Sequence, residues 1–85
     1  MATQLAEHLR ELRKGKNYTT YQLASAAGCS RPLITAIENG RRVPDLRRLW
    51  DITQALEGDF SQALYYLCVD AGIPSEAVAR LVEKP

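Results

Sequence analysis

The chain has 85 residues, a formal net charge of +1 and 46% apolar residues, with only 5 glycines and 4 prolines. This length and composition exclude a disordered or fibrous protein and predict a single globular domain. No apolar stretch is long enough to span a membrane, and the N-terminus MATQLAEHLR lacks the charged and apolar regions of a secretory signal. We therefore expect a cytoplasmic protein with no membrane partner.

The charge is distributed unevenly along the chain. Residues 1–48 contain nine Lys and Arg against four Asp and Glu, whereas residues 49–85 contain two against six. A basic half favours a polyanionic partner such as nucleic acid, although solvated surface charge alone can give the same asymmetry. The sequence therefore predicts that the N-terminal half carries the binding surface.

Apolar residues recur at helical spacing throughout, and no segment alternates as a strand would. The expected helices run, in chain order, from Gln4 to Lys14 before Gly15, from the cap Thr19 to Gly28, from the cap Ser30 to Asn39-Gly40, from the cap Asp45 to Gly58, from the cap Asp59 to Gly72, and from Ser75 to about Glu83. The expected fold is all-α, a compact bundle of five helices with a short additional C-terminal helix. We expect residues 1–58 to form the binding core and residues 59–85 to pack on it.

The segment around Gly28 carries the clearest local signals. Thr19 with Gln22 three residues later predicts a capping box, and Gly28 suits a left-handed position after a helix. Ser30 suits an N-cap, and Pro32 is tolerated in a first turn. Two short helices joined by a small turn containing glycine are the layout of a helix-turn-helix.

Residues on both sides of this turn match the signature positions of a known protein family. They are Leu23, Ala24, Gly28, Ser30, Ile34, Glu38, Gly40, Pro44, Leu49 and Leu56. With them, the chain resembles the lambda-repressor-like, Cro/XRE-type DNA-binding domains over about residues 5–57. The resemblance implies a sequence-specific regulator of transcription, a repressor that binds double-stranded DNA. An antitoxin-like or regulatory module that uses the same fold to bind a protein is the alternative, with a toxin or polymerase as the unidentified partner.

The resemblance also implies which residues meet DNA. The helix after Ser30 would enter the major groove, which admits one helix and displays a distinct pattern for each base pair. Arg31 is favoured for bidentate contact with guanine, with a phosphate contact as the alternative. The full expected set is Thr19, Thr20, Ser30, Arg31, Pro32, Thr35, Ala36, Asn39, Arg41 and Arg42.

Two residues depart from the family pattern. Thr20 stands where the family usually has a glutamine, and this shorter side chain puts the usual phosphate and base-bridging role in doubt. Pro32 removes a flexible polar side chain from the groove face, which favours readout of DNA shape over many direct base contacts.

Several other residues are given structural roles. Arg13 and Glu38 occupy places where the family often forms an ion pair, which we favour over DNA contact. Cys29 and Cys68 match no metal spacing and are expected to be reduced core thiols. The aromatic residues Trp50, Tyr65 and Tyr66 could stack on single-stranded nucleic acid, but core or interface positions are favoured. His8 is expected on the polar side of its helix, as neither ligand nor catalyst.

An enzyme is the weakest function class for this sequence. It has no glycine-rich phosphate loop and no nucleophile paired with a base. His8 is the only histidine that could act as a general acid or base. We therefore expect no catalytic residues, no metal and no cofactor.

The C-terminal segment holds more apolar surface than a small monomer leaves exposed. Family members of this size commonly bind palindromes as two-fold dimers, so we expect a homodimer through the helix after Asp59 and the tail. The expected contact residues are Tyr66, Val69, Ile73, Val78 and Leu81. Packing of the tail over that helix within one chain is the alternative.

Overall fold

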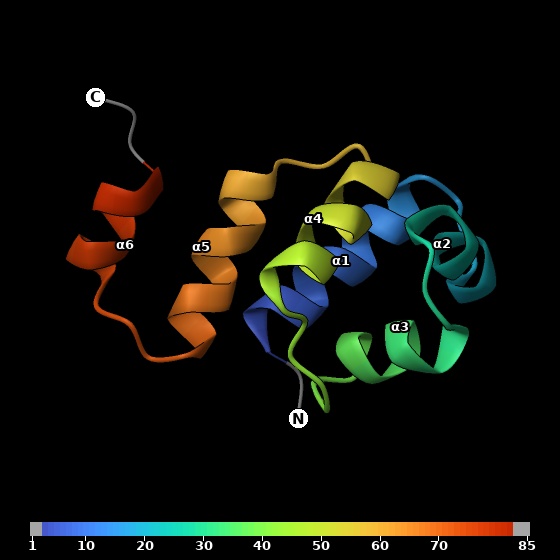
Figure 1. The fold of residues 1–85 in the computed structure, drawn as a ribbon, viewed down its shortest axis with the longest axis horizontal. Helices are drawn as coiled ribbons and strands as arrows, with labels where there is room; N and C mark the ends of the chain where they lie inside the picture. Colours follow the sequence, from blue (N-terminus) through green and yellow to red (C-terminus); the bar gives the residue numbers. More distant parts are fainter. Residues whose placement is uncertain (1–2, 83–85) are drawn as a thin grey trace.

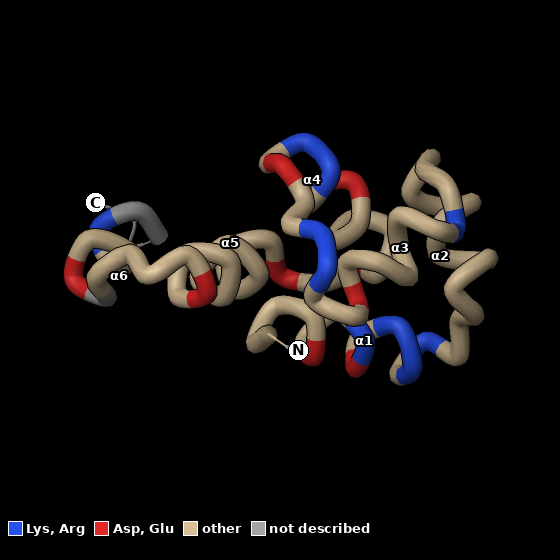
Figure 2. Tube along the Cα trace, turned by 90° about the horizontal axis from the view of Figure 1, so that it is seen from below, with Lys and Arg blue, Asp and Glu red and all other residues tan. Residues whose placement is uncertain are grey.

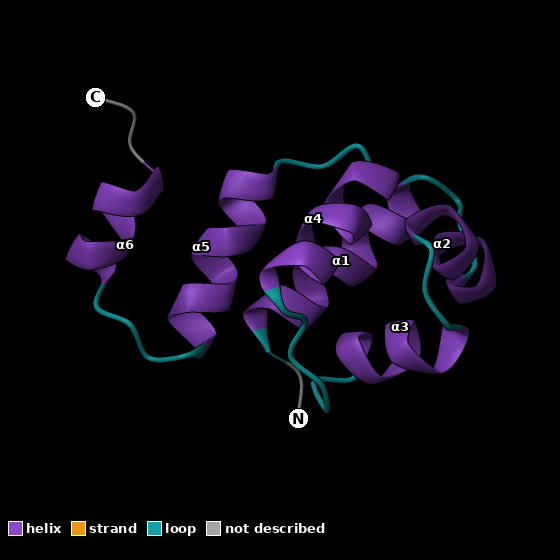
Figure 3. Ribbon diagram, viewed as in Figure 1, coloured by secondary structure: helices purple, strands orange, loops and turns teal. Residues whose placement is uncertain are grey.

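The computed structural model describes residues 3–82, and every regular element in that range is a helix (Figures 1 and 3). The helices are α1 (Gln4–Gly15), α2 (Thr20–Ala27), α3 (Arg31–Glu38), α4 (Leu46–Ala55), α5 (Phe60–Asp70) and α6 (Ser75–Val82). The expected all-α fold and all of its helices are confirmed. Within the described range, every helix is too short or too polar to cross a membrane.

One core unites the first five helices. Leu9 of α1, Leu23 of α2, Ile34 of α3, Leu49 of α4 and Ala63 of α5 are each no more than 1% exposed. They belong to a single cluster of packed apolar side chains. Burial of these side chains fixes α3 against the other helices, so its remaining face is presented outward (Figure 1).

The predicted turn between α2 and α3 is confirmed in detail. The Gln22 amide donates to Thr19 Oγ1 at 3.0 Å and the Thr19 amide donates to Gln22 Oε1 at 2.8 Å, which completes the capping box. Gly28 adopts φ +72°, a conformation that other residues rarely take. Ser30 then accepts a hydrogen bond from the Leu33 amide at 3.3 Å and starts α3.

Two predicted helix ends are displaced. α1 continues through Gly15, and the left-handed residue is Asn17 with φ 59°. α4 ends before Gly58, because Glu57 already adopts φ 54°. A Cβ at Gly58 would lie 2.8 Å from Leu12 Cδ1, so a larger residue there would require the Leu12 side chain to move.

The C-terminal helices pack on this core in sequence. α5 packs against α1 and α4, and α6 packs against α5 (Figure 1). Asp70, at the end of α5, accepts hydrogen bonds from the backbone amides of Gln4 at 3.2 Å and Leu5 at 3.0 Å. Its carboxylate therefore caps the start of α1, where free amides and the helix dipole favour negative charge.

Part of the predicted dimer surface is buried inside the chain. Val78 of α6 is 0% exposed, so it has no surface left for a second copy. This agrees with the alternative in which the tail packs over α5. Tyr66 is half-buried against the core, whereas Val69 and Ile73 keep exposed surface. Leu81 lies in α6, and its side chain falls outside the described part of the structure.

Candidate nucleic-acid interface

Six of the residues predicted to meet DNA line one open hollow of about 540 Å³ on the surface of α3 and the loop after it. They are Arg31, Pro32, Thr35, Ala36, Arg41 and Arg42. The first four come from two successive turns of α3, and the two loop arginines follow because the Arg41 and Arg42 amides both donate to the Ala36 carbonyl. The hollow thus combines a helical face with cationic side chains at its edge.

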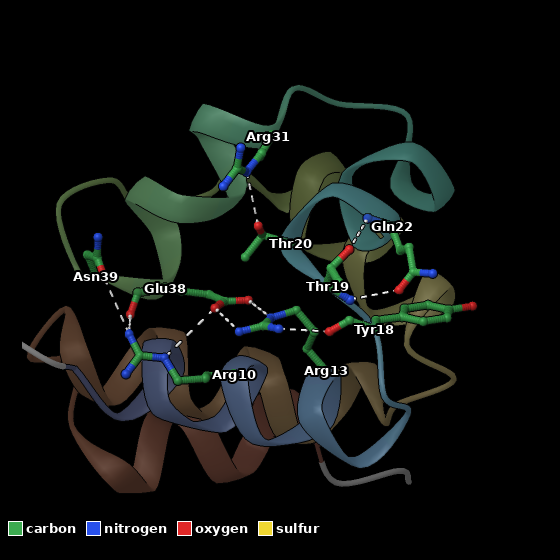
Figure 4. Close-up of polar contacts among 9 residues, drawn as sticks. All are labelled: Arg10, Arg13, Tyr18, Thr19, Thr20, Gln22, Arg31, Glu38 and Asn39. Atoms are coloured by element: carbon green, nitrogen blue, oxygen red, sulfur yellow. Dashed lines mark hydrogen bonds and ion pairs between the residues drawn. The ribbon is translucent and has the colours of Figure 1, made fainter.

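Arg31 is exposed, and its position is set by α2 (Figure 4). Its Nε donates to Thr20 Oγ1 at 3.2 Å. A guanidinium has five N–H donors, so this bond leaves the others for a base edge or a phosphate. Thr20 therefore contributes to the site by orienting Arg31.

The other predicted polar residues serve mainly as caps. Thr19 and Ser30 start α2 and α3, and each hydroxyl already accepts a backbone hydrogen bond. Asn39 ends α3, and its Oδ1 accepts a hydrogen bond from Arg10 Nη2 at 3.3 Å, toward α1 (Figure 4). The structure brings none of these three into the lining of the hollow.

Arg13 and Glu38 form the predicted ion pair between α1 and α3. Arg13 Nε lies 2.7 Å from Glu38 Oε2, and Arg13 Nη2 donates to Glu38 Oε1 at 3.0 Å. The third donor, Arg13 Nη1, bonds the Tyr18 carbonyl at 2.8 Å (Figure 4). Because the Glu38 side chain is only 5% exposed, this buried pair holds α3 at a fixed angle to α1.

Sequence reasoning missed Arg10 as a member of this network. Arg10 Nη2 donates to the Glu38 carbonyl at 2.8 Å, and Arg10 Nε lies 3.8 Å from Glu38 Oε1. Its spacing of three residues from Arg13 places both on one face of α1, which is the signal that could have identified it.

Comparison with known proteins shows which family this chain belongs to. A family model described as "Helix-turn-helix domain" matches residues 4–63. The chain belongs to the XRE-like helix-turn-helix family. The match stops inside α5, so residues 64–82 of this family member lie beyond it.

Two known proteins resemble this helix-turn-helix protein. A protein named uncharacterized HTH-type transcriptional regulator YqaE, from Bacillus subtilis (strain 168), is 38% identical over 52 residues, which are 61% of this chain and 45% of the relative. The crystal structure of an HTH_3 family transcriptional regulator from Vibrio cholerae matches with a TM-score of 0.68 at 32% identity, covering 73% of this chain and 35% of that one. The chain therefore spans a little under half the length of the curated relative.

The charge asymmetry of this helix-turn-helix protein is visible along the chain trace. Figure 2 shows Lys and Arg positions on α1, in the loop after α3 and on the first turn of α4. Asp59 caps α5, Asp70 ends it and Glu76 lies in α6, and Figure 2 also shows acidic positions on α1 and α4. The basic surface thus includes the side that carries the hollow, as a polyanionic partner requires.

The aromatic residues lie apart from the hollow of this helix-turn-helix protein. Trp50 is 43% exposed and packs its edge on Phe60, with ring centroids 5.2 Å apart. Tyr66 packs on His8, with ring centroids 4.9 Å apart, and lies 5.8 Å from the Tyr65 ring. These contacts support the core or interface role over a stacking platform for single strands.

His8 lies where the polar side of α1 meets α5. It lines an open hollow with Gln4, Glu7, Glu11 and Tyr66, but it is half-buried, and its Nε2 is enclosed with no hydrogen-bond partner in the described structure. Burial lowers the pKa of His8, an effect that the nearby Glu11 and Asp59 carboxylates oppose.

The cysteines of this helix-turn-helix protein are both free. Cys68 is buried as expected, and Cys29 is half-buried beside the core, where burial raises the pKa of its thiol. Among residues 3–82, no group of three or more His, Cys, Asp or Glu side chains is placed to hold a metal ion.

Proposed function

We propose that this protein is a regulator of transcription that binds double-stranded DNA, inserts α3 into the major groove and represses transcription at its site. The observation that carries the proposal is the open hollow on α3 and the following loop, which Arg31 lines from the helix and Arg41 and Arg42 line from the loop. Membership of the helix-turn-helix family and the names of the relatives support it.

The two kinds of arginine are assigned different roles. Arg31 lies on the first turn of α3, where recognition helices read base edges, so it is expected to contribute specificity. Arg41 and Arg42 lie beyond the helix, so they are expected to contact phosphates and to position the protein. Pro32 and Ala36 add apolar surface between them, which suits contact with a thymine methyl group.

The deciding experiment selects a cognate site from random duplexes and compares variants by fluorescence anisotropy. Arg31→Ala should lose about 1 to 3 kcal/mol of binding free energy on the cognate duplex and little on random DNA. Arg42→Ala should weaken both duplexes alike and reduce the slope of log K against log salt by roughly one unit. Equal losses from Arg31→Ala on both duplexes would refute its role in reading bases.

A second copy of the chain is proposed to complete the operator complex. Tyr65, Val69 and Ile73 recur at intervals of four residues along α5 and the turn after it, and Tyr65 and Ile73 are 38% and 40% exposed. An apolar stripe of this kind suits a two-fold contact between copies. Such a dimer would place two α3 helices about 34 Å apart on a palindrome, one turn of DNA.

A further inference from the structure

A second hollow lies beside the DNA-facing one, and we name it the junction cavity. Three segments enclose it: the start of α1, the last turn of α3 with the loop after it, and the end of α5, which all lie toward the lower side of the view in Figure 1. Its volume is about 130 Å³. Its lining is mainly apolar and includes Leu5, Ile37, Val43, Pro44 and Leu67.

The size and lining of the junction cavity define what it can hold. An apolar cavity of about 150 Å³ in another protein binds benzene, so a volume of about 130 Å³ is matched to one small ring or a short branched chain. A ligand with an apolar group of that size would contact apolar atoms from all three segments and displace water from them.

Three polar residues border the junction cavity, and Arg42 is the one that offers positive charge and has no side-chain partner within residues 3–82. Thr3 Oγ1 accepts a hydrogen bond from the Ala6 amide at 3.0 Å, and the two Asp70 oxygens accept from Gln4 and Leu5. The side chain of Arg42, by contrast, is exposed and makes no ion pair or side-chain hydrogen bond within residues 3–82. A guanidinium selects a carboxylate by charge and by its paired donors.

We propose that the junction cavity binds a small aromatic or branched aliphatic carboxylate, whose apolar body fills the cavity while its carboxylate pairs with Arg42. Arg42 lines the junction cavity and the DNA-facing hollow at once, whereas Arg41 lines only the latter. A ligand that pairs with Arg42 therefore competes with a phosphate for the same guanidinium.

The regulatory consequence rests on the proposed function. If Arg42 contacts a phosphate, the carboxylate weakens DNA binding, and DNA weakens carboxylate binding by the same factor. The carboxylate would then act as an effector that releases the repressor from DNA. The end of α5 would contact the bound ligand, and Arg42 in the loop after α3 would lose its contact with the phosphate. The end of α5 supplies Leu67, Asp70 and Ala71, all beyond the family match.

The first experiment uses benzoate as the probe and follows methyl NMR signals of the DNA-free protein. A ligand of this size binds at millimolar concentration, so titration to about 20 mM should saturate the shifts of Leu5, Ile37 and Leu67. Benzyl alcohol, which has the ring without the charge, should bind at least about fivefold more weakly. Unchanged methyl signals with benzoate would overturn the proposal.

Matched variants test the role of the guanidinium. Arg42→Gln should weaken benzoate binding by about tenfold, while Arg41→Gln should leave it unchanged because Arg41 is absent from the cavity lining. Ala71→Leu, at an exposed position bordering the cavity, should also weaken binding, with Ala77→Leu on α6 as the control. Equal benzoate affinity in the Arg42→Gln and Arg41→Gln variants would refute the pairing.

The second experiment adds the cognate duplex. Saturating benzoate should reduce DNA affinity severalfold in the unmodified protein and have no effect on Arg42→Gln. Benzoate binding in the cavity without any release of DNA would overturn the regulatory coupling. Failure of the ligand-free protein to bind any duplex would instead refute the proposed function, since the NMR titration contains no DNA.

Discussion

Arg31 Nε at the start of α3 donates to Thr20 Oγ1 at the start of α2, across 3.2 Å. This bond joins the two helices of the helix-turn-helix at the ends that face the proposed DNA surface (Figure 4). The family usually has a longer glutamine at position 20, and here the short threonine hydroxyl accepts a hydrogen bond from Arg31 and orients it.

Thr20→Val removes the acceptor while keeping the side-chain shape, so Arg31 loses its orienting partner. We expect a loss of about 1 kcal/mol in discrimination between cognate and random duplexes, less than Arg31→Ala causes. Anisotropy titrations of both duplexes measure it. The double variant should match Arg31→Ala alone, because Thr20 acts only through Arg31. Losses that simply add would show that Thr20 contacts DNA independently.

The pair formed by Arg13 and Glu38 should dominate the stability of the α1–α3 contact. Arg13→Met leaves the carboxylate of Glu38 buried and poorly compensated, which typically costs about 3 to 5 kcal/mol. We expect the lower end of that range, because Arg10 remains 3.8 Å from the same carboxylate. Urea denaturation of the single variants gives the free energies of unfolding.

A double-mutant cycle on the same pair separates stability from DNA binding. Arg13→Met combined with Glu38→Leu should be much less destabilised than the sum of the single changes, since no lone charge remains buried. The comparison with Arg10→Met shows how much the second arginine contributes. Coupling near zero, together with lost DNA affinity, would place Arg13 among the DNA contacts.

His8 should make the packing of α5 on α1 sensitive to acid. Its pKa is lowered in the folded protein by burial, so the unfolded chain binds the proton first as pH falls through its ordinary value of about 6.5. The free energy of unfolding is therefore expected to decrease as pH falls from about 6.5 to the folded pKa of His8, and this contribution to become constant below it. Protonation makes both ring nitrogens donors, and the enclosed Nε2 has no acceptor within the described residues.

The control for this pH dependence is His8→Phe, which preserves a ring against Tyr66 and removes the titration. The difference in free energy of unfolding between the two proteins, measured by urea denaturation at several pH values, cancels the carboxylates common to both. Glu11 and Asp59, which face His8 from α1 and the start of α5, are among them. A difference that does not change with pH, or that grows in favour of the unmodified protein in acid, would contradict the burial argument.

Local physics explains why most of the fold could be predicted from the sequence. The Thr19–Gln22 capping box, the left-handed Gly28 and the N-cap Ser30 act within a few residues, so sequence spacing alone determines them. The grouping of Arg31, Pro32, Thr35 and Ala36 on one surface was also predictable, because residues on successive turns of one helix share a face whatever packs behind it.

The failures all depend on contacts between distant segments. Asp70 caps α1 from 65 residues away, and no local pattern marks an acidic residue at the end of one helix as the cap of another. Arg10 of α1 reaches the Glu38 carbonyl and Asn39 at the end of α3, and His8 meets Tyr66 across the α1–α5 contact. Val78 is apolar and at helical spacing, a pattern that fits a contact within the chain and a contact with a second copy equally well. In the structure α6 packs on α5 and Val78 is buried within the chain.

The stripe of Tyr65, Val69 and Ile73 predicts self-association of the full chain. Light scattering at high micromolar concentration should give about twice the 9.5 kDa mass of one chain. Ile73→Lys places a charge in the centre of a two-fold contact, opposite its own copy, so it should give a monomer. Ala77→Lys, at an exposed position on α6, is the matched control and should stay dimeric. A monomer for the unmodified chain that fills a palindrome one half-site at a time, with no cooperativity, would rule the dimer out.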